Sequence, residues 1–202
     1  MSAIKITDQP LAPWRSLLTR ALHINRSQPY SRYLQLATVR RDGRPANRTV
    51  VFRGFLENSN QLQIVTDWRS EKISQIEQQP WGEACWYFTK TREQFRLLGY
   101  LTLIGVDSVD TTLQKARQLI WQGLSDAARS QFAWPDPQAE KAKEVLAFSP
   151  PPPSPDEPLA NFCLLLLDPE RVEHLELRGE PQNRCRYYLD SSQQWIAQPI
   201  NP

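Results

Sequence analysis

The spacing of apolar residues is helical near the start of the chain. In LAPWRSLLTRALHI, residues 11–24, apolar side chains recur every three or four positions, which predicts a helix with one buried face. Pro13 suits the first turn of this helix, and Arg15 and Arg20 are expected to face solvent. The first predicted element is therefore a helix that packs against the rest of the fold.

A series of β-rich runs follows, separated by short turns. The first two runs flank Asp42-Gly43, a strong hairpin signal, and the third run is QLQIVTD, which ends at residue 67. A short helix ends before Pro80, and EACWYF and EQFRLLGYLTLIGV then continue the strand pattern. Consecutive strands with short turns predict a mostly β, α+β fold, in which an antiparallel sheet closes into a barrel with flanking helices.

Helical spacing returns at about residues 110–148, first around Leu113 to Trp121 and again in AEKAKEVLAF. These helices are expected to cover the barrel or to gate its mouth. The Pro-rich segment 149–158, SPPPPSPDEP, predicts a stiff polyproline linker. After it, ANFCLLLLDPERVEHLEL and RCRYYLD are interpreted as a closing pair of strands, so that residues 1–202 form a single domain.

The net charge of +2 conceals a basic N-terminal quarter. Residues 1–53 contain ten Lys and Arg against two Asp, which gives 10 − 2 = +8. Such a segment could face nucleic acid, anionic lipid or a phosphorylated small molecule. No zinc-finger spacing, RGG repeat or RRM-like motif accompanies the arginines, so we expect no nucleic-acid partner. A small-molecule ligand is the favoured interpretation.

Cysteine and histidine are too sparse for several kinds of active site. Cys85, Cys163 and Cys185 are odd in number and far apart, which argues against a disulfide framework or a cysteine-rich metal site. His23 and His174 have no HExxH context and no triad pattern, so no metal and no hydrolytic triad are expected. Any chemistry is then expected to come from a cofactor.

The sequence predicts a cytoplasmic protein without a membrane partner. The N-terminus shows no secretory-signal pattern, because polar and charged residues interrupt it. The longest apolar run, FCLLLL, is far too short to span a bilayer.

A candidate anion site lies at a strand-to-helix junction in VTDWRSEKISQIEQQP, residues 65–80. Ser70 suits an N-cap and Lys72 lies in the first turn, where unpaired N–H groups and the helix dipole favour an anion. A lysine is by itself unfavourable at that end of a helix, and an anionic ligand would remove the conflict. The alternative is that Ser70 only caps the helix and Lys72 faces water.

Arg48 and Arg53 are five residues apart on the run NRTVVFRGF. Side chains of a regular strand alternate in direction, so the two arginines face opposite sides unless a bulge intervenes. We expect Arg48 to bind an anion and Arg53 to reach another part of the ligand or another subunit. The backbone of Val50 and Val51 and the amide of Gln94 could bind a flat heterocycle. The alternative is a pair of arginines at the edge of a strand.

Four segments in order, RTVVFR, VTDWRSEK, EQFRLLG and NRCRYY, resemble the pyridoxamine 5'-phosphate oxidase-like, FMN-binding split-barrel family. The resemblance runs from about Tyr33 to Tyr188. It implies a homodimer with two FMN sites at the subunit interface and redox chemistry on a small-molecule substrate, with Arg48, Ser70 and Lys72 at the FMN phosphate. The residues that it assigns to FMN are Arg48, Thr49, Val50, Val51, Arg53, Val65, Thr66, Ser70, Lys72, Gln94 and Arg184.

Two departures from the family pattern are informative. Glu71 stands where the family has an arginine beside its lysine, and Glu180 and Gln182 stand where the oxidase has basic groups for its substrate. We therefore expect FMN binding without efficient oxidation of pyridoxamine phosphate. No catalytic side chain can be named, although Trp134 is a candidate for flavin stacking or for a lid. The alternative function is a non-catalytic carrier or sensor of a flavin or tetrapyrrole-type ligand on the same barrel.

Overall fold

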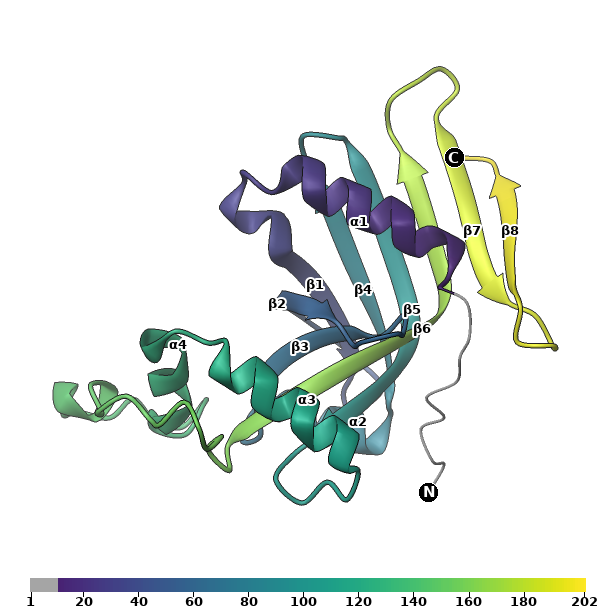
Figure 1. Ribbon diagram of the computed structural model, residues 1–202. Coiled ribbons are helices and arrows are strands. Elements are labelled where there is room, and N and C mark those ends of the chain that lie inside the picture. The colour runs from purple at the N-terminus through teal and green to yellow at the C-terminus, as the bar shows by residue number, and fades with distance from the viewer. Residues whose placement is uncertain (1–10) are drawn as a thin grey trace.

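Six antiparallel strands close into a barrel in the computed structural model, which describes residues 11–202 (Figure 1). In sheet order they are β3 (Leu62–Asp67), β2 (Pro45–Phe55), β1 (Tyr33–Val39), β4 (Trp81–Phe88), β5 (Glu93–Ile104) and β6 (Phe162–Glu176). Pairing of β3 with β6 closes the ring, and β7 (Asn183–Leu189) and β8 (Trp195–Ile200) extend the sheet beyond β6. The predicted antiparallel barrel is confirmed.

The helices of the described residues lie outside the barrel or across its end (Figure 1). The α-helices are α1 (Pro13–Asn25), α2 (Glu71–Gln78), α3 (Thr111–Gln122) and α4 (Asp126–Ser130). Short 3-10 helices are η1 (Pro29–Arg32), η2 (Gln131–Ala133) and η3 (Val145–Phe148). The flanking helices of the predicted fold class are therefore present.

α1 lies across the barrel because its apolar face joins the main core (Figure 1). Trp14, Leu18 and Ala21 are fully buried together with side chains that point into the barrel. The expectation that Arg15 faces solvent is wrong. Its guanidinium carbon lies 3.4 Å from the centroid of the Phe55 ring, a cation–π contact that half-buries the charge, and burial lowers the pKa of Arg15.

The apolar run FCLLLL forms the start of β6 and is buried on both faces. Successive side chains of a strand point in opposite directions. Leu165 and Leu167 pack into the barrel core, whereas Leu164 and Leu166 pack with Leu113 of α3. The run is continuous because α3 covers the outer side of the barrel there, and the predicted helix at that position is confirmed.

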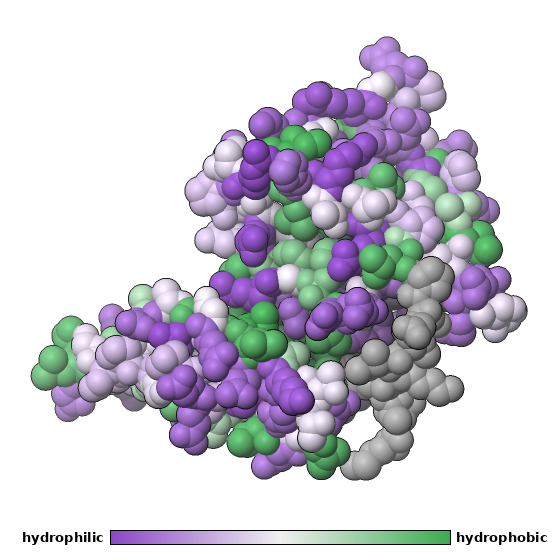
Figure 2. All heavy atoms as spheres, in the orientation of Figure 1, coloured by the Kyte–Doolittle hydropathy of each residue, from purple (hydrophilic) through white to green (hydrophobic). Residues whose placement is uncertain are grey.

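The prediction of a second helix in this region, AEKAKEVLAF at 139–148, is wrong. Residues 139–144 have no regular structure, and only the short η3 follows. Val145 and Leu146, which supplied the helical spacing, are 81% and 82% exposed, so no packing stabilises a helix of this length. Residues 124–148, called the arm below, instead project from the barrel, and hydrophobic atoms gather at the tip of that projection (Figures 1 and 2).

The C-terminal region contains three strands where the sequence predicted two. β8 was missed because most of its side chains are exposed and Pro199 interrupts its pattern.

The Pro-rich segment 149–158 lies outside the sheet, as expected, and runs beside α3, where Trp121 Nε1 donates to the Ser154 carbonyl at 2.8 Å.

Residues 1–10, on which the expectation about the N-terminus depends, lie outside the described residues. Within residues 11–202 no helix is both long enough and apolar enough to cross a membrane.

Gly99 allows β5 and β6 to approach at a bulge, and its replacement should be costly. The register of the pair shifts at Leu98 and Gly99, and a Cβ at Gly99 would lie 2.0 Å from the Asp168 carbonyl oxygen. We expect Gly99→Ala to lower the free energy of unfolding by at least about 1–3 kcal/mol, because the backbone at Asp168 would have to move. Urea unfolding measures the loss.

Gly123 provides the control. It ends α3 with an ordinary φ of −76°, and the nearest atom to an added Cβ is 3.6 Å away. Gly123→Ala should change the free energy of unfolding by no more than about 0.5 kcal/mol. Equal losses in the two variants would contradict this account of the bulge.

Candidate functional site

β2 and β3 separate along their length, and this separation positions the site. They pair where residues 52–55 of β2 oppose residues 62–64 of β3. The register shifts between Phe52 and Gly54, so Arg53 lies in a β-bulge. Before Phe52 the strand β2 pairs with β1, whereas β3 continues along β6. The barrel is split between β2 and β3, which confirms that part of the predicted fold.

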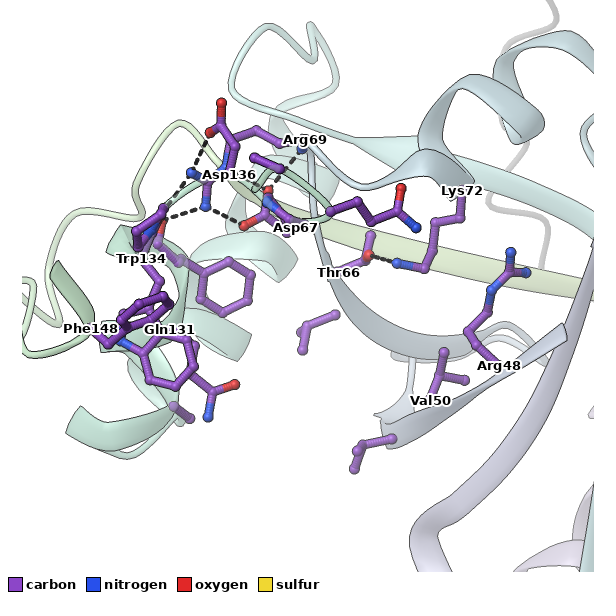
Figure 3. Close-up of a pocket in the computed structure, with 18 of the residues that line it drawn as sticks. Arg48, Val50, Thr66, Asp67, Arg69, Lys72, Gln131, Trp134, Asp136 and Phe148 are labelled. Atoms are coloured by element: carbon purple, nitrogen blue, oxygen red, sulfur yellow. Dashed lines mark hydrogen bonds and ion pairs between the residues drawn. The ribbon is translucent and has the colours of Figure 1, made fainter. Parts of the chain in front are cut away.

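A cavity of about 600 Å³ occupies the split, a volume typical of small-molecule sites. One wall comes from β2, β3 and α2, and the arm forms the opposite wall (Figure 3). The first wall contains eight of the predicted residues, namely Arg48, Thr49, Val50, Val51, Arg53, Val65, Thr66 and Lys72. The arm contributes aromatic side chains, namely Phe132, Trp134 and Phe148.

Arg48 is fixed by hydrogen bonds to neutral acceptors. One terminal nitrogen, Nη1, donates to Thr38 Oγ1 at 2.6 Å and to the carbonyls of Leu36 and Ala46 at 3.2 Å. The other, Nη2, donates to Gln75 Oε1 at 2.9 Å. Burial lowers the pKa of Arg48, but an arginine remains charged at any physiological pH. Its positive charge is therefore held in place without being cancelled.

Lys72 lies in the first turn of α2, two residues after the N-cap residue Ser70. Its Nζ donates to Thr66 Oγ1 at 2.8 Å and to Ser70 Oγ at 2.9 Å. The Ser70 hydroxyl donates to the Asp67 carbonyl at 2.7 Å and makes no side-chain cap bond. The N-cap position was predicted correctly, but the hydroxyl faces Lys72 and leaves the first N–H groups of α2 uncapped.

Arg48 and Lys72 have no carboxylate partner among the ion pairs of residues 11–202. Glu71 is next to Lys72 in sequence, but its Oε1 lies 3.4 Å from Arg40 Nε instead. The pKa of Lys72 is lowered first by burial and then by the charge of Arg48. Two cations that repel each other and contact only neutral acceptors are suited to bind an anion.

Arg53 adds a third cation to the cavity wall. The bulge directs its side chain to the same cavity as Arg48, which a regular strand would not do. Its Nε is buried without a hydrogen-bond partner in the described part of the chain, and burial lowers its pKa. An unpaired donor of this kind favours a ligand with an acceptor group.

Arg69 fastens the arm to the start of α2 (Figure 3). Its guanidinium donates to both carboxylate oxygens of Asp67, at 3.0 and 2.7 Å, and to Asp136 Oδ1 at 2.8 Å. It also donates to the Trp134 carbonyl at 2.9 Å. Hydrogen bonding to Asp67 raises the pKa of Arg69. Its charge is therefore neutralised, in contrast to those of Arg48 and Lys72, and its role is to hold the arm wall in place.

Gln94 and Arg184 lie outside the cavity of one chain. Gln94 lies on β5 opposite Tyr87 and Leu175, and Arg184 on β7 donates to Glu173 at 2.5 Å. Their roles toward a ligand stay predictions.

Comparison with known proteins identifies the family. Residues 11–105 match the family model described as pyridoxamine 5'-phosphate oxidase, FMN-binding domain. An Arabidopsis thaliana protein named pyridoxine/pyridoxamine 5'-phosphate oxidase 2 is 37% identical over 202 residues, which cover 95% of this chain and 98% of that protein. The chain belongs to the pyridoxamine 5'-phosphate oxidase-related family.

Solved structures agree with this family assignment. A Nostoc punctiforme protein described as pyridoxamine 5'-phosphate oxidase-related and FMN-binding is 61% identical, with a TM-score of 0.93, and the match covers 96% of this chain and 100% of that one. PhzG from Burkholderia lata, in complex with tetrahydrophenazine-1-carboxylic acid, is 20% identical, with a TM-score of 0.76 over 100% of this chain and 98% of that one. The second likeness is one of fold alone.

Two contacts that support the walls of the cavity were not predicted from the sequence. Gln75, which is buried and accepts from both Arg48 and Thr38, carries no motif that distinguishes it from the other glutamines of α2. The pairing of Arg69 with Asp136 joins residues 67 positions apart, so no local pattern could reveal it. Trp134, named only as a candidate, does line the cavity and packs edge-on against Phe148.

The lowered pKa of Lys72 leads to a prediction about stability and pH. The folded protein holds this proton less tightly than the unfolded chain, whose lysines titrate near a pKa of about 10.4. The cost of burying the charge is therefore fully present below the folded pKa and disappears as the pH rises. We expect the stability of the ligand-free protein, relative to Lys72→Met, to increase as the pH rises from neutral toward the unfolded-chain pKa of about 10.4.

Urea unfolding of both proteins across this pH range provides the measurement, and the difference between them cancels the other titrating groups. Lys115→Met, on the exposed side of α3, is the control and should follow the unaltered protein. Parallel curves for the unaltered protein and Lys72→Met would show that Lys72 is not held in an unfavourable charged state.

Proposed function

We propose that the protein is an FMN-binding flavoprotein and an oxidoreductase acting on a small molecule. The observation that supports this proposal is the pair Arg48 and Lys72, two cations without a carboxylate partner in residues 11–202, beside a cavity of about 600 Å³. A phosphate dianion matches that charge. The family's FMN-binding model and the FMN-binding description of the Nostoc relative favour a flavin mononucleotide over other phosphorylated ligands.

The residues of the cavity fit both the phosphate and the apolar part of such a ligand. Lys72 Nζ, Arg48 and the uncapped N–H groups of α2 are suited to the phosphate, with Ser70 as a further donor once Lys72 turns toward the anion. Along the split, Val50 and Val65 offer apolar surface. When bound, FMN supplies the capacity to accept or donate a hydride, and the chain orients it and controls the charge around it.

We further propose that the working unit is a homodimer. Gln94 and Arg184, which the family resemblance assigns to the flavin, lie outside the cavity of one chain. A second copy would be needed to bring them to it.

What we propose about the substrate depends on two positions at which the sequence departs from the oxidase pattern. Glu180 and Gln182 lie in the segment between β6 and β7, where the oxidase pattern has basic groups. An acid repels a substrate phosphate, so we propose a substrate other than pyridoxamine phosphate, even though the Arabidopsis relative bears the oxidase name. Reduction of the bound flavin by NAD(P)H, with turnover, would distinguish an enzyme from a non-catalytic carrier.

Titration with FMN and with riboflavin tests the phosphate site. Arg48→Ala and Lys72→Ala each remove a charge-assisted contact worth about 1.5–3 kcal/mol, so each should weaken FMN roughly 10- to 150-fold. Riboflavin, which lacks the phosphate, should bind the unaltered protein weakly and respond little to either change. The double variant should lose less than the sum of the two, because both cations contact one phosphate. Flavin fluorescence reports each affinity.

Arg44→Ala is the matched control. Arg44 lies in the β1–β2 turn with an 82% exposed side chain, so its removal should leave FMN affinity unchanged. Undiminished FMN affinity in both Arg48→Ala and Lys72→Ala would place the phosphate elsewhere and reject this assignment.

A further inference from the structure

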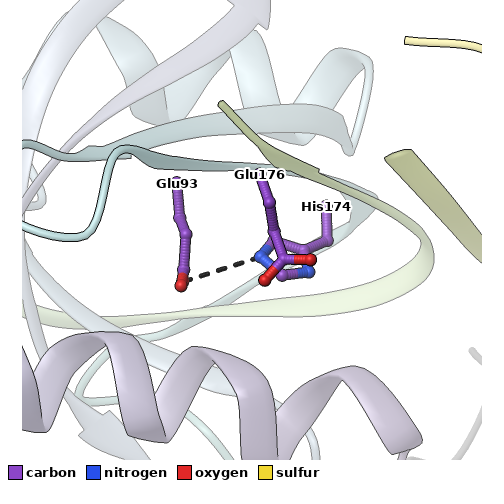
Figure 4. A group of neighbouring side chains, drawn as sticks. All are labelled: Glu93, His174 and Glu176. Atoms are coloured by element: carbon purple, nitrogen blue, oxygen red, sulfur yellow. Dashed lines mark ion pairs between the residues drawn. The ribbon is translucent and has the colours of Figure 1, made fainter. Parts of the chain in front are cut away.

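A second group of ionisable side chains lies where α1 crosses the ends of β5 and β6, and none of it lines the cavity of the split. Glu93 of β5 is directly opposite Glu176 of β6, and His174 is two residues earlier on the same face of β6. Ligand atoms of the three side chains lie within 4.8 Å of one another. Figure 4 shows the three side chains gathered at one place on the two strands.

Among the residues that the structure describes, two atoms of this group are buried without a hydrogen-bond partner. Glu93 is 5% exposed and His174 is 4% exposed, and their facing atoms, Oε2 and Nε2, are 3.6 Å apart. The His174 ring stacks on Phe95, with centroids 4.3 Å apart and planes at 13°, so its orientation is fixed. Buried polar atoms in proteins are nearly always paired, and these two point at the same space.

Arg20 of α1 accounts for only part of the negative charge. It donates to Glu93 Oε1 at 2.9 Å and lies 3.5 Å from Glu176 Oε1. One arginine against two carboxylates placed directly opposite each other leaves an excess of negative charge. Arg20 explains why α1 docks at this point, but within residues 11–202 Glu93 Oε2 and His174 Nε2 still lack a hydrogen-bond partner.

We propose that Glu93, His174 and Glu176 form a binding site for a divalent transition-metal cation. One imidazole nitrogen and two carboxylate oxygens are ligands that Zn²⁺ accepts, with water in the fourth position. Tetrahedral bonds of about 2.0–2.1 Å place ligand atoms about 3.3 Å apart, close to the 3.6 Å between His174 Nε2 and Glu93 Oε2. Glu176 is half-buried and can rotate to complete the set.

The site has an entry path and a structural consequence. His174 and Glu176 also line a second cavity, of about 430 Å³, beside the C-terminal residues. A bound cation would neutralise the remaining charge and link β5 to β6 directly under α1. It would stabilise the fold by binding the native state and not the unfolded chain. This role is independent of the flavin site.

Calorimetric titration of the purified protein with Zn²⁺ tests the proposal. We expect one saturable ion per chain and a rise in melting temperature. Glu93→Gln and His174→Gln should each weaken Zn²⁺ about tenfold or more, because each removes a ligand. His23→Gln is the matched control, since His23 is the other histidine of the sequence and lies exposed on α1; it should bind Zn²⁺ as the unaltered protein does.

Arg20→Gln separates a metal site from a purely structural ion pair. Removing the competing positive charge should tighten Zn²⁺ binding, whereas an ion pair that merely anchors α1 predicts no gain. Glu176→Gln, at a half-exposed position, provides a ligand variant if the buried ones fail to fold. The proposal is overturned if the unaltered protein shows no saturable Zn²⁺ binding, or if His174→Gln binds as tightly. Neither measurement depends on how much flavin is bound, so either result would leave the proposed FMN function unaffected.

Discussion

The fold keeps two positive side chains close together without a negative partner. Burial and mutual repulsion both disfavour the charge on Lys72, and neither it nor Arg48 reaches a carboxylate in the described chain. Neutral hydroxyl, carbonyl and amide oxygens hold both cations in position. Such an arrangement costs stability in the ligand-free protein, and an anion with two negative charges offsets that cost.

The sheet creates the space for this pair by coming apart at a defined point. β2 pairs with β3 over only a few residues, and the bulge at Arg53 lies next to the last of these pairs, Phe52 with Ile64. β3 then follows β6, and the turn after it carries α2, whose first turn holds Lys72. Arg69 in the same turn fastens the arm opposite. One short turn therefore positions both the candidate anion site and the far wall of the cavity.

Much of the barrel could be predicted from the sequence because its signals are local. Alternating strands, the Asp42-Gly43 hairpin and the helix after Ser70 each depend on neighbouring residues, and all were predicted at nearly their observed positions. The prediction that Arg48 and Lys72 belong to one site came from the order of the four segments that resemble the family.

The failures share a physical cause, which is dependence on distant contacts. The spacing of Val145 and Leu146 predicted a helix, but nothing in the described chain packs against them. Arg15 was expected in water because its helix face is polar, and Phe55, from a strand 40 residues later, covers it. Gln75 holds Arg48 in place through a contact that no sequence pattern marks.

The ionisation of the bound phosphate tests the central claim most directly. Free FMN carries a phosphate whose second pKa is about 6, so its ³¹P resonance shifts as the pH is lowered through that value. Held between Arg48 and Lys72, the phosphate should stay dianionic, and the ³¹P resonance of bound FMN should remain constant well below about pH 6. A bound resonance that titrates as the free ligand does would contradict the assignment of this cation pair to the phosphate.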